Sequence, residues 1–296
     1  MSYSGPEITV SASLSRSIRQ MQRSLDSRLE ALSRRVTPLT VHACRTQARR
    51  LRAILRTFKH AFNPTELARY ENVLRRLTRE LAPLRCADVE LQVIERLARD
   101  RSIPKEDGLE EVRAIAAHAR SRALWDLEAK LIGGAWLGRL ERMRQTASDP
   151  QLIIESQAPM AVMALRILSR QRRRLRRQFR THKPSPKALH KRRLKIKTLR
   201  YLLERCAPDN AAVRAELKQL RLLQDWLGEF HDEWTLRRRL ARQSPHLRAT
   251  IDIRFQLRWH RVEILRSIEK HQHHLLRIWK DTPPHGVRDP RAAEIA

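Results

Sequence analysis

One helical pattern occurs twice in this chain, and that repeat constrains the fold more than any other feature of the sequence. In the first copy, apolar residues follow steps of three and four, which is the spacing of a single buried helix face. They are Val41, Cys44, Ala48, Leu51, Leu55, Phe58 and Phe62. The same steps, shifted by one residue, place a basic stripe beside that face: His42, Arg45, Arg49, Arg52, Arg56 and Lys59.

The second copy aligns with the first at a shift of 148 residues. Its stripe consists of His190, Arg193, Lys197 and Arg200, and Leu189, Leu199 and Leu203 repeat the apolar frame. The next helix repeats at a shift of 146, which aligns Arg75 with Arg221. The same shift aligns four pairs of apolar residues. We predict an internal duplication whose halves, residues 13–150 and 151–281, pack about a pseudo-two-fold axis with the stripes facing a shared groove. Residues 1–12 and 282–296 are expected to be flexible tails.

The rest of the chain also reads as helix, so the predicted fold class is all-α. Only 7 glycines occur, and the prolines fall between helical runs. Gly228 is expected to end one helix and Asp232 to cap the next. A break near His271 is left open. The predicted helices are Ser15–Arg34, Leu39–Ala61, Thr65–Ala82, Ala87–Arg99, Leu109–Ile132, Ala135–Thr146, Ala158–Arg180, Pro186–Cys206, Asn210–Leu227, His231–Arg242 and Pro245–Lys280.

The charge of the chain is strongly positive and concentrated in two blocks. There are 62 Lys and Arg against 32 Asp and Glu, a net charge of +30. No acid occurs between Ala31 and Thr65 or between Ser156 and Leu203. A solvated helix face normally mixes signs, because i,i+4 ion pairs stabilise the helix. Single-signed stripes at matched positions favour a polyanion partner: nucleic acid, an anionic membrane or a phosphate polymer.

Arginine suits phosphate binding, because its planar fork donates two parallel hydrogen bonds and stays charged. The repeat adds Arg75 and Arg221 to the candidate surface. The helix before the second stripe adds Arg166, Arg170, Arg173, Arg174 and Arg177. Each histidine of the stripes opens a helix, where a protonated ring could donate to phosphate and strengthen binding at lower pH.

Enzyme, cofactor and metal signatures are not found. The sequence lacks the glycine-rich phosphate loops and the G-x-S-x-G nucleophile motif, so we expect binding without catalysis and no cofactor. The best histidine cluster, His271, His273 and His274, has no Cys or acid at ligand spacing, so no metal is expected. Three cysteines, no signal-peptide core and no apolar run of about 18 residues predict a cytoplasmic protein that does not insert into membranes.

Four motifs in order resemble the CHAD (conserved histidine α-helical domain) family. The two signature helices read V-H-x-x-R-x-x-x-R-R-L-R from Val41 and L-H-x-x-R-x-x-x-K-x-L-R-Y from Leu189. The two turns that follow read LAPLRCADVEL and LQDWLGEFHDEWTL. The resemblance covers roughly residues 13–281. The first turn departs from the family pattern, with Cys86 in place of Asp and Ala82 in place of Gly.

The resemblance implies two pseudo-symmetric four-helix bundles around a basic central groove or pore. It also implies binding of inorganic polyphosphate and association with polyphosphate granules in bacteria. Carried over by position, the binding residues are His42, Arg45, Arg49, Arg52, His190, Arg193, Lys197 and Arg200.

A nonspecific nucleic-acid binder is the alternative interpretation. Single-strand binding uses aromatic side chains for base stacking, and both stripes lack them. Tyr201 and Trp226 lie near or within apolar frames and are expected in the core. A phosphate polymer needs only charge and hydrogen bonds, so polyphosphate is the leading prediction, with nucleic acid among other possible polyanion partners.

Overall fold

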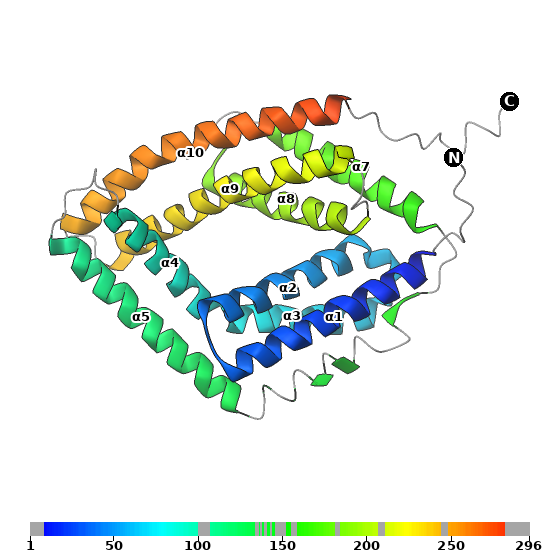
Figure 1. Cartoon of the computed structure of the whole chain (residues 1–296), viewed down its shortest axis with the longest axis horizontal. Helices are drawn as coiled ribbons and strands as arrows, with labels where there is room; N and C mark the ends of the chain where they lie inside the picture. The colour runs from blue at the N-terminus through cyan, green and yellow to red at the C-terminus, as the bar shows by residue number, and fades with distance from the viewer. Residues whose placement is uncertain are drawn as a thin grey trace. The chain divides into compact units, whose positions relative to one another are not determined.

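The structure is a computed structural model in which every regular element among the described residues is a helix (Figure 1). Isolated β-bridges join Thr9 to Pro159 and Phe62 to Ile153. The predicted all-α class is confirmed. The residues described are 9–99, 107–133, 136, 138, 141–142, 144–145, 152–154, 159–180, 184–206, 211–243 and 248–281.

The chain forms two compact units, and they do not follow the predicted halves throughout. The N-terminal unit contains Leu14–Glu155 and also Asp232–Arg261. The C-terminal unit contains Met1–Ser13, Ser156–His231 and Val262–Ala296. Two long helices therefore contribute residues to both units, although the sequence repeat places them in the second half.

The N-terminal unit is built mainly from consecutive helices. They are α1 (Val10–Arg34), α2 (Pro38–Thr57), η1 (Lys59–Ala61), α3 (Pro64–Glu80), α4 (Ala82–Arg99) and α5 (Asp107–Ile132). All seven apolar residues of the predicted face are buried, although α2 ends at Thr57 and not at Ala61, so that Phe58 and Phe62 lie beyond it. A second core cluster joins α4 and α5 to the late part of α9, through Val93, Ile94, Val112, Ala116, Leu236 and Leu240.

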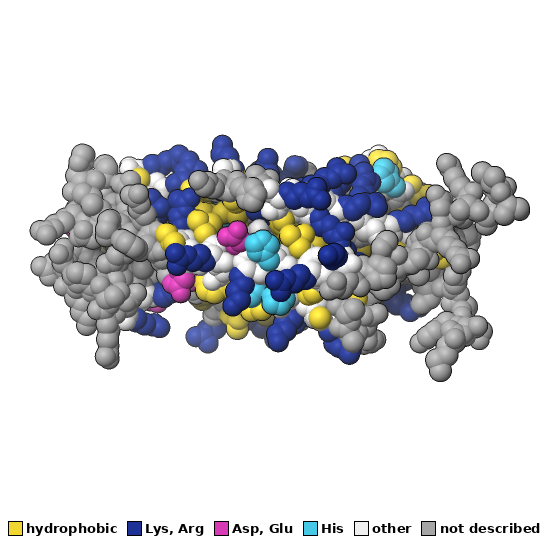
Figure 2. Space-filling view, turned by 90° about the horizontal axis from the view of Figure 1, so that it is seen from above, with side chains coloured by type: hydrophobic (Ala, Val, Ile, Leu, Met, Phe, Trp, Pro, Cys, Tyr) yellow, Lys and Arg dark blue, Asp and Glu magenta, His cyan; other side chains and the backbone are white. Residues whose placement is uncertain are grey.

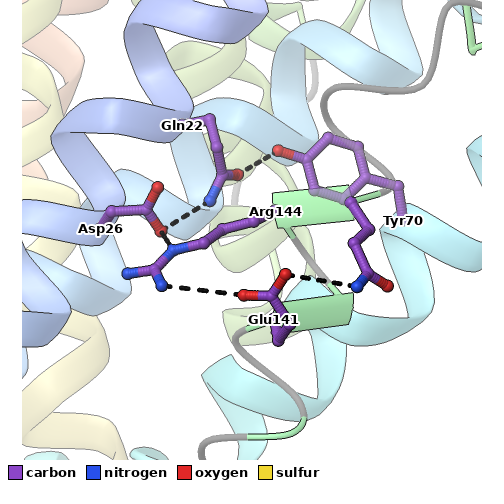
Figure 3. Close-up of polar contacts among 6 residues, drawn as sticks. Gln22, Asp26, Tyr70, Glu141 and Arg144 are labelled. Carbon is purple, nitrogen blue, oxygen red and sulfur yellow. Dashed lines mark hydrogen bonds and ion pairs between the residues drawn. The ribbon is translucent and has the colours of Figure 1, made fainter.

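A polar network joins α1 to α3 inside this unit (Figure 3). The buried Tyr70 hydroxyl donates to Gln22 Oε1, and Gln22 Nε2 donates to Asp26 Oδ1 at 2.9 Å. Arg144 Nε lies 3.4 Å from the same Asp26 oxygen, and Arg144 also approaches Glu141 at 3.9 Å. Burial and the charge of Asp26 raise the pKa of Tyr70, so the phenol stays a hydrogen-bond donor.

The C-terminal unit contains the second copy of the pattern. Its helices are α7 (Met160–Phe179), α8 (Pro186–Cys206), most of α9 (Ala211–Gln243) and the second part of α10 (Arg248–Asp281). The predicted frame residues Leu189, Leu199 and Leu203 are buried, as expected. Phe179 stacks on Trp279 with ring centroids 5.8 Å apart, and this contact joins α7 to α10.

The two signature helices begin with the same cap, 148 residues apart. Both α2 and α8 start with a proline, whose missing N–H group is not needed in the first turn. Thr37 Oγ1 accepts from the Thr40 backbone N–H at 3.1 Å, and Thr40 Oγ1 accepts in return from the Thr37 N–H. Ser185 Oγ accepts from the Ala188 N–H at 3.3 Å. Local sequence therefore sets both starts.

Several predicted boundaries are wrong, and the largest difference concerns Gly228. α9 continues through Gly228 without a break, so this glycine does not end a helix and Asp232 does not begin one. A Cβ atom at position 228 would lie 3.4 Å from Arg193 Nη2. An arginine of the stripe thus lies next to the α9 backbone at Gly228.

Three smaller differences concern helix ends. Only Leu81 separates α3 from α4, because α4 begins at Ala82 and not at Ala87. α10 is continuous through His271. α1 begins at Val10, which is fully buried, so the expected tail 1–12 is wrong for its last residues. The tail 282–296 and most of the helix expected at 135–146 lie outside the described residues.

Candidate anion-binding site

The residues of the α2 stripe differ in how far their side chains are exposed to solvent, which their spacing in the sequence does not show. His42, Arg49 and Arg56 are exposed, and Arg52 is half-buried. Arg45 is only 8% exposed. The stripe therefore runs along the edge of the α2 packing face and enters the core at one position.

Arg45 reaches a neighbouring helix end. Its Nη1 donates to the backbone carbonyl of Thr78, in the last turn of α3, where helix carbonyls lack intrahelical partners. Burial and, to a smaller extent, the positive charge of Arg49 lower the pKa of Arg45 to about 10, while Cys86 acts in the opposite direction. The guanidinium is thus a buried cation held by a helix C-terminus.

Arg52 lies at the centre of a group of like charges. Burial lowers its pKa, and Arg56, Arg75 and Arg49 lower it further, whereas Glu71 raises it. Its Nε atom is buried and has no hydrogen-bond partner among the described residues. Arginines from α2 and α3 therefore lie within electrostatic range of one another.

The α8 stripe is half-buried along its length: His190, Arg193, Lys197 and Arg200. The His190 ring contacts the His231 ring of α9, with centroids 4.4 Å apart and planes tilted by 36°. Together with the contact between Arg193 and Gly228, this places the stripe along the α8–α9 packing edge. His231 is a neighbour of the stripe that sequence reasoning treated only as part of a turn.

Arg200 and Arg221 meet at one carboxylate. Glu204 Oε1 lies 3.8 Å from Arg200 Nη1 and 3.5 Å from Arg221 Nη2. The Arg200 guanidinium also lies over the Tyr201 ring, 5.0 Å from its centroid. Tyr201 is buried as predicted, and Trp226 is half-buried. An acid therefore lies beside the α8 stripe, although the sequence from Ser156 to Leu203 contains none.

On α7 the arginines divide into two groups. Arg170, Arg173 and Arg177 are exposed, as are Arg166 and Arg174. The residues between them are structural: Arg172 donates to both carboxylate oxygens of Glu216, and Arg176 donates to the Trp279 carbonyl.

A similar contact involves Arg192, next to the α8 stripe. Its Nη2 donates to the carbonyl of Gln178 in the last turn of α7. The same kind of contact is made by Arg45 and Arg176 at the ends of α3 and α10. Three arginines of this basic chain are thus used to bind helix C-termini, where a cation compensates the helix dipole. A count of charges cannot separate them from ligand-facing arginines.

On the face seen in Figure 2, Lys and Arg side chains are numerous and few acidic side chains are visible. His271 Nδ1 pairs with Gln219 Oε1 at 3.0 Å, and His273 and His274 are exposed. Within the described ranges, no group of three or more His, Cys, Asp or Glu side chains is arranged to hold a metal ion. None of the described helices is long and apolar enough to cross a bilayer.

The family model of the CHAD domain matches residues 13–241, which include both stripes and both following turns. The chain belongs to the CHAD-domain family. That family is associated with polyphosphate binding. A comparison with the curated proteins finds no match.

Two solved structures share the CHAD fold seen here. The CHAD domain from the plant Ricinus communis superimposes with a TM-score of 0.72 at 22% identity, over 90% of this chain and 92% of that one. PptA from Streptomyces chartreusis superimposes with a TM-score of 0.66 at 17% identity, over 92% of this chain and 99% of that one. At these identities the likeness concerns the fold.

The departures from the CHAD turn pattern leave the fold intact. Ala82 begins α4, so the position where the family usually has glycine is the first turn of a helix. Cys86 is exposed on α4. Cys86 and Arg85 both act on the pKa of Arg45, so the first turn of α4 lies near the buried residue of the α2 stripe.

Proposed function

We propose that this CHAD protein binds inorganic polyphosphate through the α2 stripe with Arg75 of α3 in the N-terminal unit, and through the α8 stripe with Arg221 of α9 in the C-terminal unit. The observation that carries the proposal is the group of arginines around Arg52. Like charges so close together destabilise the ligand-free protein, and a chain of phosphates would offset their repulsion while accepting hydrogen bonds. Family membership supports the same ligand.

The chemistry of the stripes favours a phosphate polymer over nucleic acid. The described stripe residues are Arg, Lys and His, and the Tyr201 ring, which lies under the Arg200 guanidinium, is buried. A buried ring cannot stack on a base, so Tyr201 provides no stacking platform of the kind that single-strand binders use. Nucleic acid remains the outcome to test against.

A titration with matched variants tests the proposal. The stripe variant carries Arg49→Ala, Arg52→Ala, Lys197→Ala and Arg200→Ala. The control changes four exposed residues on α1 and α10: Arg19, Arg23, Arg266 and Lys270. Each variant loses three arginines and one lysine, two residues per unit, so removing four charges from +30 leaves +26 in both.

We expect labelled long-chain polyphosphate to bind the control almost as well as the wild type, and the stripe variant far more weakly. The logarithm of affinity should fall linearly with the logarithm of salt concentration, because each neutralised phosphate releases counterions. Challenge with duplex and single-stranded DNA at equal phosphate should displace little polyphosphate. Equal losses in both variants, or equal competition by DNA, would reduce the protein to a nonspecific polyanion binder.

Binding without catalysis and location at polyphosphate granules belong to the same proposal. The first is checked by incubating the protein with polyphosphate and measuring released orthophosphate, which should stay at the level of the no-protein control. The second is checked by fluorescence microscopy of the tagged chain together with a polyphosphate stain. Diffuse fluorescence in granule-containing cells would contradict it.

A groove shared by the two stripes stays a prediction of the repeat. Separate halves are a poor test of it, because Asp232–Arg261 belongs to the N-terminal unit. A full-length double-mutant cycle is better: Arg49→Ala with Arg52→Ala, Lys197→Ala with Arg200→Ala, and all four together. Coupling between the two pairs is expected if one polymer contacts both stripes, whereas strictly additive effects indicate independent sites.

A further inference from the structure

Each stripe ends beside a single carboxylate that contacts or lies near two arginines. In the N-terminal unit, Arg56 Nε donates to both oxygens of Glu71 at 3.0 and 3.1 Å, and the charge of Glu71 also acts on Arg52. In the C-terminal unit, Glu204 lies within 4 Å of Arg200 and Arg221. The carboxylates thus lie among the cations that would hold the ligand.

The two carboxylates come from different places in the sequence repeat. At a shift of 148 residues, Glu204 of α8 aligns with Arg56 of α2. At a shift of 146 residues, Glu71 of α3 aligns with Leu217 of α9. The two halves therefore supply one acid to the stripe from non-equivalent positions and from different helices. This points to a need for the charge itself, since no shared packing position explains both residues.

The ion pairs of Glu71 and Glu204 differ from the structural ion pairs of the chain. Glu216, held by Arg172, has a side chain only 2% exposed. The side chains of Glu71 and Glu204 are 22% and 27% exposed, and their partners Arg56 and Arg221 are more exposed still, although Arg200 is only 13% exposed. Ion pairs whose carboxylates are open to solvent stabilise a fold little. A contribution to stability is therefore a weak reason for placing acids inside an anion-binding surface.

We propose that Glu71 and Glu204 are internal counterions, which occupy the stripe arginines in the free protein and are displaced when a phosphate polymer binds. The proposal rests on the proposed function and adds a specificity determinant to it. Because the ligand must overcome the repulsion of each carboxylate, affinity is held below what the arginines alone would give. Polyphosphate has no sugar between its charges, so it competes with a carboxylate better than single-stranded DNA does.

The test neutralises both acids in the full-length protein. Glu71→Gln with Glu204→Gln is compared with a control, Glu110→Gln with Glu269→Gln, which changes exposed acids on α5 and α10. Both variants lose two negative charges, so the net charge rises from +30 to +32 in each. Labelled polyphosphate and labelled single-stranded DNA are titrated separately at fixed salt.

We expect the glutamine variant, Glu71→Gln with Glu204→Gln, to bind polyphosphate at least about fivefold more tightly than its control. The reason is that it no longer has the carboxylates, which repel phosphate even at the dielectric constant near a protein surface. Its affinity for single-stranded DNA should rise by a larger factor, so discrimination between the two ligands falls. Equal affinities of the two variants for polyphosphate would overturn the counterion role while leaving the proposed function in place.

If the wild type binds no polyphosphate, the proposed function fails. A second measurement then tests the counterion role of Glu71 and Glu204 by itself. Added sodium sulfate should raise the melting temperature of the glutamine variant, Glu71→Gln with Glu204→Gln, more than that of its control, because sulfate replaces the missing carboxylates beside Arg52 and Arg200. Sodium chloride at matched ionic strength separates this effect from general screening. The same sulfate response in both variants would overturn the proposal.

Discussion

Replacing Arg45 with methionine separates the two roles that its position allows, a helix cap and a ligand-binding residue. Burial lowers the pKa of Arg45 from its ordinary value of 12.5 to about 10. Because the folded-state pKa of this cation is lowered, its charged form is disfavoured by folding at every pH below about 10. At about 1.4 kcal/mol per pH unit, that penalty is about 3 kcal/mol at neutral pH.

Methionine keeps much of the volume of the arginine stem but removes the charge and the hydrogen bond to the Thr78 carbonyl. The lost hydrogen bond has a charged donor, so its loss costs about 1.5–3 kcal/mol. The relieved burial penalty is as large or larger, so Arg45→Met should leave the free energy of unfolding unchanged or raise it by up to about 1.5 kcal/mol. At an unfolding entropy of about 2.1 cal/mol/K per residue, that is a rise of at most about 2–3 °C in melting temperature.

The assay is urea unfolding followed by circular dichroism, with Arg49→Met as the control on the exposed part of the stripe. Arg49→Met should leave the free energy of unfolding within about 0.5 kcal/mol of the wild type. Both variants should bind polyphosphate more weakly. A loss of more than about 1 kcal/mol in Arg45→Met would refute the reasoning and make this arginine a structural cap of α3.

Three further outcomes follow from buried or capping groups. Glu216→Ala should lower the free energy of unfolding, measured in urea, by about 3–4 kcal/mol. The substitution leaves Arg172 without its buried partner and removes the acceptor of the Trp279 indole N–H. A loss below about 1 kcal/mol would contradict this prediction. Thr37→Ala should cost about 1 kcal/mol by the same assay, since it removes the α2 capping box. Burial, Lys270 and His274 lower the pKa of His271, so the unfolded state binds more protons near pH 6. Stability should therefore fall as the pH drops through about 6.5, and His271→Gln should reduce that slope.

The sequence alone was sufficient to predict the all-α fold, the buried faces of α2 and α8, and the family. Apolar spacing on α2 and α8 identified frames whose residues are all buried, because a helix that packs on one face needs apolar side chains every three to four residues. Prolines at 38 and 186 and the hydroxyl residues before them fixed the starts of both helices, since caps act within one turn. The basic stripes were visible for the same reason.

The tertiary structure decided which of those arginines are exposed and which are bound to other parts of the protein. Periodicity gives the angle of a side chain about its own helix, but it does not say which neighbouring helix end or carboxylate lies opposite. Arg45 is buried against the end of α3, and Glu71 reaches Arg56 from a different helix. Gly228 looked like a helix end because glycine is common there, yet it lies within α9, where Arg193 packs against it. These are contacts between residues 15 to 35 positions apart, and only packing brings them together.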